Sequence, residues 1–170
     1  MKRTMMVLTL ALLAAFATAQ LATAQEAAPP TGATQYFGMA AGFVTGYGIS
    51  YRNWPDVMGI QITGTPVISG GVTALDLGLV GLYRLNDAPW TRFFLYFGGQ
   101  GYYSSSSYAN GDGTSTATTT SGGFAGGGIG LELIFFDHIV LDIQGGLQAS
   151  FGSSGFGLGP SGETGLFYRL

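Results

Sequence analysis

Apolar side chains recur at every second position through most of the chain after residue 34, which is the period of a β-strand. In residues 138–150, for example, Ile139 and Leu141 fall on one face and Asp142 falls on the other. The alternation predicts an all-β chain with eight short antiparallel strands. Their expected ranges are 35–44, 46–54, 57–64, 73–85, 91–103, 122–136, 138–150 and 162–170.

The connections between these strands alternate in length. Three are short and rich in turn-forming residues, namely Asn53-Trp54-Pro55-Asp56, Asn86-Asp87-Ala88-Pro89 and Asp137-His138. Longer loops are expected at three polar or glycine-rich segments, residues 64–72, 104–121 and 151–161. The segment 104–121 is also low in complexity. The first link, near Thr45, is very short. Membrane β-barrels typically have short turns at one rim, where both termini also lie, and longer loops at the other rim.

The N-terminal segment has the pattern of a cleavable secretion signal. Met1-Lys2-Arg3 precedes an apolar run that ends at Phe16, and Ala22-Thr23-Ala24 provides a small-residue cleavage site. We expect cleavage after Ala24, with Ala19 as the earlier alternative, so that residues 1–24 are the signal. A periplasmic linker at 25–34 and one domain at 35–170 would follow.

Composition narrows the classes of protein that this domain can belong to. Charged residues make up 9% of the sequence, against about 25% in soluble domains. Beyond the leader only four basic residues remain against nine acidic ones, which argues against nucleic-acid binding. No segment of the domain approaches the 18 or more apolar residues of a membrane helix, so a closed β-barrel is the membrane architecture that the sequence allows.

The direction of the apolar face decides between a membrane barrel and a soluble one. A soluble secreted β-barrel that binds an apolar ligand would turn its Leu, Ile and Phe rows inward. The opposite face, which it would then expose to water, is largely Gly, Ala, Ser and Gln, with very few charges. The sequence therefore favours apolar rows that face lipid, and the soluble barrel remains the alternative.

With this orientation, the charged residues of the strands point into the lumen. The arginines lie near the short-turn ends of their strands, and two carboxylates lie at a similar depth, which predicts an ion-paired network of Arg52, Arg84, Arg92, Glu132, Asp142 and Arg169. Eight strands enclose a space that side chains can fill. A filled lumen is therefore the expectation, and a narrow pore for small solutes is the alternative.

The last strand resembles the C-terminal signal that the barrel-assembly machinery reads in outer-membrane proteins. The matching positions are Glu163, Gly165, Tyr168 and Leu170, although the final residue of that signal is usually Phe. The domain thus resembles the small eight-stranded OmpA/OmpX-like barrels. This resemblance implies an up-and-down transmembrane barrel in the bacterial outer membrane, with outer-membrane lipid and the assembly machinery as partners; it names no extracellular partner.

Aromatic residues near the strand ends fit the girdles of a membrane barrel: Tyr36, Tyr51, Trp54, Tyr83, Trp90, Phe93, Tyr103, Phe135 and Tyr168.

Motifs for catalysis and cofactors are weak. The single histidine, His138, lies in a turn at the presumed periplasmic rim with no nucleophile at a defined spacing. Gly157, Gly159 and Gly162 match a dinucleotide-binding spacing, but Pro160 interrupts it and a strand follows. No residues have metal-ligand spacing. The sequence therefore predicts a non-enzymatic protein without a cofactor, with a structural or surface-interaction role.

Overall fold

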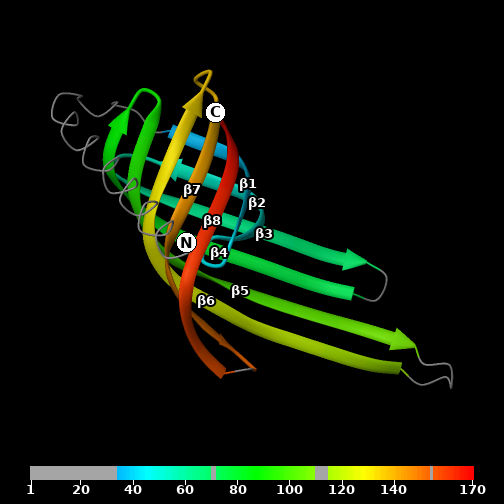
Figure 1. Ribbon diagram of the computed structural model, residues 1–170. Coiled ribbons are helices and arrows are strands. Elements are labelled where there is room, and N and C mark those ends of the chain that lie inside the picture. Colours follow the sequence, from blue (N-terminus) through cyan, green and yellow to red (C-terminus); the bar gives the residue numbers. More distant parts are fainter. Residues whose placement is uncertain (1–33, 70–71, 110–114, 154) are drawn as a thin grey trace, which may run out of the picture.

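The computed structural model describes residues 34–69, 72–109, 115–153 and 155–170. In these residues eight antiparallel strands close into a barrel in which each strand pairs with its sequence neighbours and the last pairs with the first (Figure 1). The predicted fold class is confirmed. The signal and residues 25–33 of the linker lie outside the described part. The strands are β1 (Thr34–Gly42), β2 (Gly46–Trp54), β3 (Met58–Ser69), β4 (Val72–Ala88), β5 (Thr91–Ala109), β6 (Ser115–Phe135), β7 (Ile139–Gly152) and β8 (Gly155–Arg169).

The alternation along each strand separates an apolar outer wall from a mixed interior. On β4, Leu77 and Leu79 are exposed on the outside, whereas Val80 and Leu82 are buried inside. The Leu and Ile rows face outward, as the sequence pattern predicted. Among the described strands, no outward position carries Asp, Glu, Lys or Arg.

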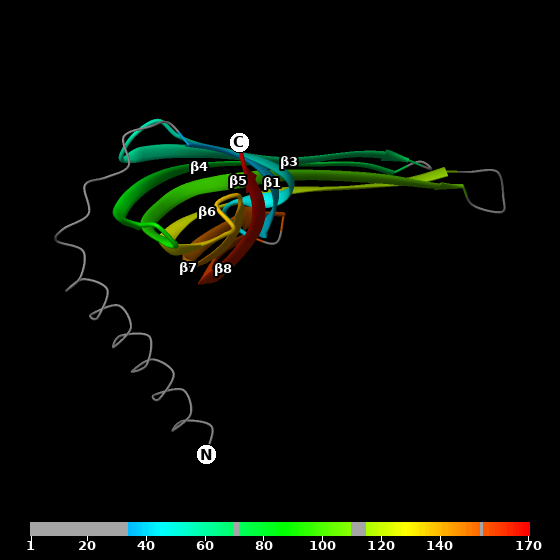
Figure 2. The ribbon, with the colours of Figure 1, turned by 90° about the horizontal axis from the view of Figure 1, so that it is seen from above.

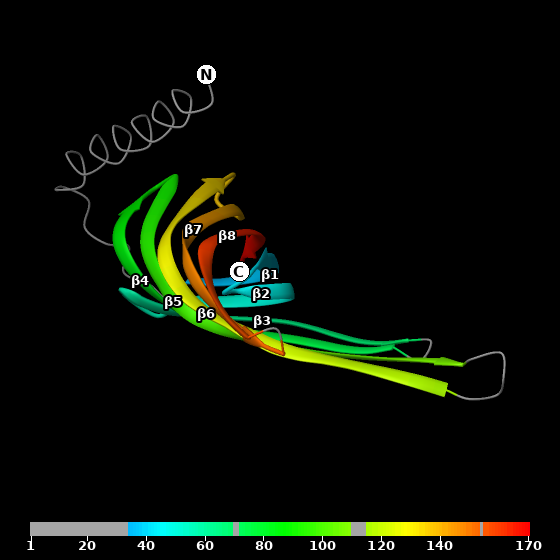
Figure 3. The same ribbon diagram turned by 60° about the horizontal axis from the view of Figure 1, so that its bottom comes forward.

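Several strands are longer than the sequence predicted. Most of the expected loops at 64–72, 104–121 and 151–161 belong to strands, and β5 and β6 reach 19 and 21 residues. Their Ser and Thr residues pair across the strands, for example Ser105 with Thr119. Thr is β-branched and suits a strand, so polarity alone was a poor sign of a loop. The long parts of β3 to β6 project from the barrel as a ribbon (Figures 2 and 3).

In contrast, β1 and β2 have nine residues each, and the turn that joins them enters the barrel. Gly46 and Gly48 at the start of β2 have φ angles of 84° and 123°. These are values that glycine adopts without the clash of a side chain. They turn the chain away from the line of the wall and bring residues 43–45 into the lumen.

The described residues contain no helix that is long and apolar enough to cross a membrane.

Candidate functional site

The strand register places the charged residues of the lumen next to one another. Arg92 on β5 lies directly opposite Glu132 on β6, and Glu132 lies opposite Asp142 on β7. On the other side of the barrel, Arg52 on β2 lies between Tyr36 on β1 and Gln61 on β3. Side chains at opposed positions on one face of a sheet are in contact range. The register alone therefore brings two groups of polar side chains together.

Glu132 is at the centre of this network and is fully buried. One carboxylate oxygen accepts hydrogen bonds from Arg52 Nη1 at 2.5 Å and from Trp54 Nε1 at 3.2 Å. The other accepts from Arg92 Nη1 at 3.1 Å and from the Tyr36 hydroxyl at 3.3 Å. Two cations and two neutral donors thus surround a single buried carboxylate.

Arg52 joins Glu132 to a second carboxylate. Its Nη2 forms an ion pair with Asp142, and its Nε donates to Gln61 Oε1 at 2.9 Å. The guanidinium also lies over the ring of Phe167, with Cζ 4.7 Å from the ring centroid. Arginine suits this position because its planar group can bond several acceptors and stack on an aromatic ring while it stays charged.

Asp87 is a member of the network that the sequence did not reveal. Its Oδ2 lies 3.0 Å from Arg92 Nη2 and 3.1 Å from Arg84 Nη1. The sequence pattern placed Asp87 in a turn, but β4 continues to Ala88 and its register with β5 shifts between Arg84 and Asn86. A bulge of this kind changes which residues face inward. The shift directs Asp87 into the lumen, and no sequence signal marked it.

The network contains five of the six residues that the sequence assigned to it. Arg169 is half-buried and lies opposite Tyr36 on β1. Within the described residues Arg169 takes part in no ion pair. The structure therefore separates Arg169 from the group of Arg52, Arg84, Arg92, Glu132 and Asp142.

Two of the nine aromatic residues assigned to the girdles also lie in the lumen. Tyr36 and Trp54 are fully buried, and both donate to Glu132. Their assignment to the girdles was wrong because it used distance from the strand end and ignored the alternation of faces. The other seven lie on outward positions.

A second layer of contacts fills the lumen farther from the termini. The inward turn between β1 and β2 presents the backbone N–H groups of Val44 and Thr45 to the Glu163 carboxylate, at 3.0 and 2.7 Å. The Ser161 hydroxyl donates to the same carboxylate. Val44 and Thr45 are almost completely buried. Glu163, for which the sequence predicted a place in the assembly signal, holds this turn in place within the lumen.

The inward turn extends from β8 to the opposite side of the barrel. The Thr45 carbonyl oxygen lies against the backbone of Gly78 on β4, where an added Cβ would be 2.1 Å from it. Val44 contacts Gly126 on β6 in the same way, since a Cβ there would be 3.0 Å from Val44 Cγ2. The main chain of the turn therefore crosses the lumen, and glycines on both strands leave it room. The sequence showed only that this link was short.

The remaining residues of the C-terminal pattern divide between the two faces. Gly165 faces the lumen, whereas Tyr168 and Leu170 are exposed on the outside. Tyr168 stacks on His138 with the ring centroids 5.4 Å apart. Within the described residues, no group of three His, Cys, Asp or Glu is placed to hold a metal ion.

No protein-family model and no curated protein matches the chain. Among solved structures, the N-terminal β-barrel domain of Pseudomonas aeruginosa OprF is 14% identical with a TM-score of 0.48, and the alignment covers 84% of this chain and 100% of that one. The attachment invasion locus protein Ail of Yersinia pestis is 12% identical with a TM-score of 0.45, covering 81% and 97%. Ail is described as an outer membrane protein.

Proposed function

We propose that this protein is an integral barrel of the bacterial outer membrane, with no enzymatic activity and a closed lumen, and that it has a structural or surface-interaction role. The observation that carries the proposal is the division of side chains across the wall. Large apolar residues cover the outside of the barrel, and none of the described outward strand positions carries a charged residue. The ion pairs lie inside. Lipid accommodates such a wall, and internal pairing satisfies the charges.

The soluble alternative requires the reverse arrangement. A secreted barrel that binds an apolar ligand needs a polar outer surface and an apolar cavity. Here the interior contains the buried residues Arg52, Arg92 and Glu132, and the inward turn occupies the part of the lumen farther from the termini. The arrangement supports the membrane barrel.

Arginine substitutions on the wall test the membrane location. Leu79 lies outward in the middle of β4, so Leu79→Arg is expected to destabilise the protein in lipid vesicles by about 2–4 kcal/mol. Ile68 is 84% exposed on the projecting end of β3, and Ile68→Arg should cost less than about 1 kcal/mol. Urea titration of vesicle-inserted protein, followed by the heat-dependent shift on a detergent gel, measures both. Equal effects of the two substitutions would contradict immersion of the wall in lipid.

Conductance distinguishes the closed lumen from a narrow pore. Both layers of contacts cross the lumen, so planar bilayers that contain the inserted protein should carry no steady current at moderate voltage. The heat-dependent gel shift of the same preparation confirms that the protein is folded. A reproducible single-channel current, increased when Arg92 is truncated, would favour the pore alternative.

The projecting ribbon supports a surface-interaction role. β2 pairs with β3 only as far as Gly64, and β7 pairs with β6 only from Gly122 onward. In the described part, residues 65–69 of β3 and 117–121 of β6 therefore pair with a strand on one side only, with β4 and with β5 respectively, and their other side is an edge. Exposed edges of this kind can pair with an extended segment of another protein.

A further inference from the structure

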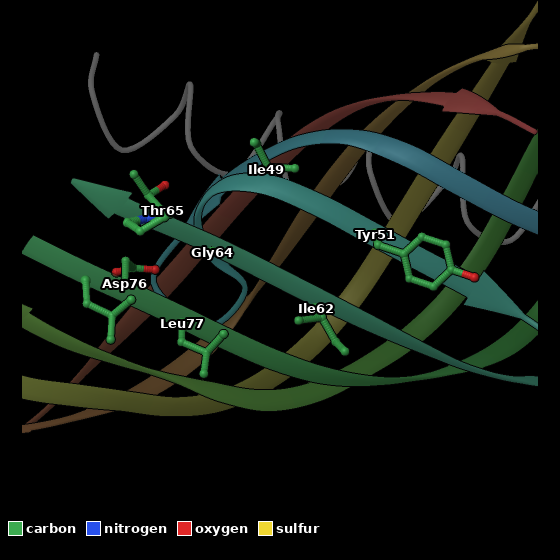
Figure 4. Close-up of a pocket in the computed structure, with 9 residues that line it drawn as sticks. Ile49, Tyr51, Ile62, Gly64, Thr65, Asp76 and Leu77 are labelled. Atoms are coloured by element: carbon green, nitrogen blue, oxygen red, sulfur yellow. The ribbon is translucent and has the colours of Figure 1, made fainter. Parts of the chain in front are cut away.

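Beyond the inward turn, on the side away from the termini, the inward positions of β3 to β6 continue onto one side of the projecting ribbon. This side, which is continuous with the lumen, is the ribbon face. Asp76 and Tyr102 lie directly opposite each other on it, and Thr65 lies beside Asp76 (Figure 4). The shallow hollow in Figure 4 belongs to the outer wall and is lined mainly by Leu75, Leu77 and other lipid-facing residues, on the opposite side of β4 from the Asp76 side chain. Asp76 and Tyr102 are partly exposed, so the ribbon face is accessible from the mouth of the barrel.

Three aromatic side chains form a cluster on the ribbon face. Tyr102 on β5 and Phe124 on β6 have their ring centroids 5.9 Å apart, and Phe43 reaches Phe124 from the inward turn, with the centroids 5.4 Å apart. Tyr102 lies across β6, because a Cβ added to Gly122 would be 2.5 Å from the Tyr102 hydroxyl oxygen. Phe43 is 40% exposed. The cluster therefore presents an apolar surface to the mouth of the barrel and not to lipid, and partly exposed aromatic residues of this kind can anchor a bound segment.

Asp76 gives the ribbon face a negative charge. It is the one charged residue among the described positions of the ribbon and its base, which are 64–69, 72–78, 98–109 and 115–126. Asp76 Oδ1 accepts a hydrogen bond from the Tyr47 N–H at 2.9 Å, and Oδ2 accepts none from the described residues. Gln100 Oε1 is buried and lacks a donor among these residues. Both side chains converge near Gly46, where an added Cβ would be 2.7 Å from Asp76 Oδ1 and 3.3 Å from Gln100 Oε1. The potential at this point is therefore negative.

The buried network shows which group a set of this kind binds within the same chain. The Arg52 guanidinium forms an ion pair with Asp142, donates to the Gln61 side-chain oxygen and lies over the ring of Phe167. The ribbon face offers the same three kinds of group, namely a carboxylate, a glutamine oxygen and aromatic rings. A guanidinium suits them because it stays charged, can bond a carboxylate through two N–H groups and stacks on aromatic rings.

We infer that the ribbon face binds an arginine side chain of another polypeptide, with the guanidinium at the Asp76 carboxylate and the apolar stem across the Tyr102 ring. An apolar side chain next to this arginine packs on Phe43 and Phe124. The inference rests on the proposed surface-interaction role and gives the partner its chemistry, a segment in which a basic residue is flanked by apolar ones. An acidic segment is repelled, because the ribbon face has a carboxylate and no basic residue at its described positions.

Binding of short peptides tests the inference. The full chain is inserted into phosphatidylcholine nanodiscs, whose lipid has no net charge, and is titrated against peptides of sequence Leu-X-Leu that carry a neutral fluorophore. The residue X is arginine, lysine or citrulline, and citrulline has nearly the shape of arginine without the charge. Fluorescence anisotropy should show that the arginine peptide binds about tenfold more tightly than the citrulline peptide. The lysine peptide should lie between them, because lysine keeps the charge but lacks the planar fork.

Two pairs of variants locate the site. Asp76→Asn keeps an acceptor for the Tyr47 N–H but removes the charge, so the arginine peptide should bind only as tightly as the citrulline peptide. Asp56→Asn makes the same change in an exposed turn at the opposite rim and should bind as the original protein does. Tyr102→Ala removes a ring of the cluster and should weaken all three peptides about tenfold. Tyr103→Ala removes the adjacent ring, which faces outward and is 43% exposed, and should leave binding unchanged.

Equal binding of the arginine and citrulline peptides to the original protein would overturn the assignment of a cation, and equal binding by Tyr102→Ala and Tyr103→Ala would overturn the site. If Asp76→Asn does not fold, the comparison of arginine with citrulline and the two tyrosine variants decide the matter. The heat-dependent gel shift is recorded on every sample. A protein that shows the shift but binds none of the peptides contradicts this inference alone, whereas a protein that never inserts contradicts the proposed function.

Discussion

Replacing Glu132 with alanine is expected to lower the free energy of unfolding by about 3–5 kcal/mol, because the change leaves buried guanidinium groups without their shared carboxylate. Arg52 would keep Asp142, and Arg92 would keep Asp87. Neither of these remaining carboxylates can replace the central one, which bonds both arginines. Urea titration of the protein in lipid vesicles, followed by tryptophan fluorescence, measures the effect.

Two substitutions serve as controls for the Glu132 experiment. Asp56→Ala removes a carboxylate from the exposed turn between β2 and β3 and should change the stability by less than about 0.5 kcal/mol. Glu132→Gln keeps the size and one acceptor but removes the charge, so its effect should lie between those of the two alanine variants. If Glu132→Ala and Asp56→Ala had the same stability, the buried network would have no measurable role in holding the barrel.

The second large effect is expected at Glu163, whose replacement by alanine should destabilise the protein by about 2–4 kcal/mol. Two buried backbone N–H groups, those of Val44 and Thr45, would lose their acceptor, and each such loss costs about 1–3 kcal/mol. The turn should then leave the lumen part of the time. The same urea titration gives the free energy.

A single cysteine reports the position of the turn, because the chain contains no cysteine. In Val44→Cys the thiol should be protected from a water-soluble maleimide, since Val44 is fully buried. Adding Glu163→Ala should increase the labelling rate about tenfold or more, as expected when a local opening becomes easier. Equal labelling rates with and without Glu163 would show that the carboxylate does not hold the turn.

The sequence predicted most of the barrel and most of the network because both depend on the alternation of strand faces. Once the strands and their faces were known, Arg52, Arg92 and Glu132 had to point into one narrow space. Asp87 could not be found in this way, since a single register shift after Arg84 changes the face of the residues that follow. Arg169, in contrast, was predicted to belong to the network but forms no ion pair among the described residues.

The inward turn and the projecting ribbon were missed for a different reason. Both depend on the residue at which a strand stops pairing with its neighbours, and the periodicity of apolar residues does not indicate that residue. The φ angles of Gly46 and Gly48 bend β2 into the lumen, but a glycine in sequence does not reveal which conformation it adopts. Ser and Thr between 104 and 121 indicated a loop by their polarity, whereas their cross-strand pairing extends β5 and β6.

The buried charges also specify how the strands align during assembly. A strand that slides by two residues keeps its Leu rows toward lipid, so the apolar pattern cannot distinguish the correct alignment from this error. The charges can, because a slide of two residues along β6 would place Gly130 or Ile134 opposite Arg92 in place of Glu132. The misaligned barrel would contain unpaired guanidinium groups in its interior. The ion pairs therefore distinguish the correct strand register from a register shifted by two residues, which the alternation of apolar and polar residues alone does not.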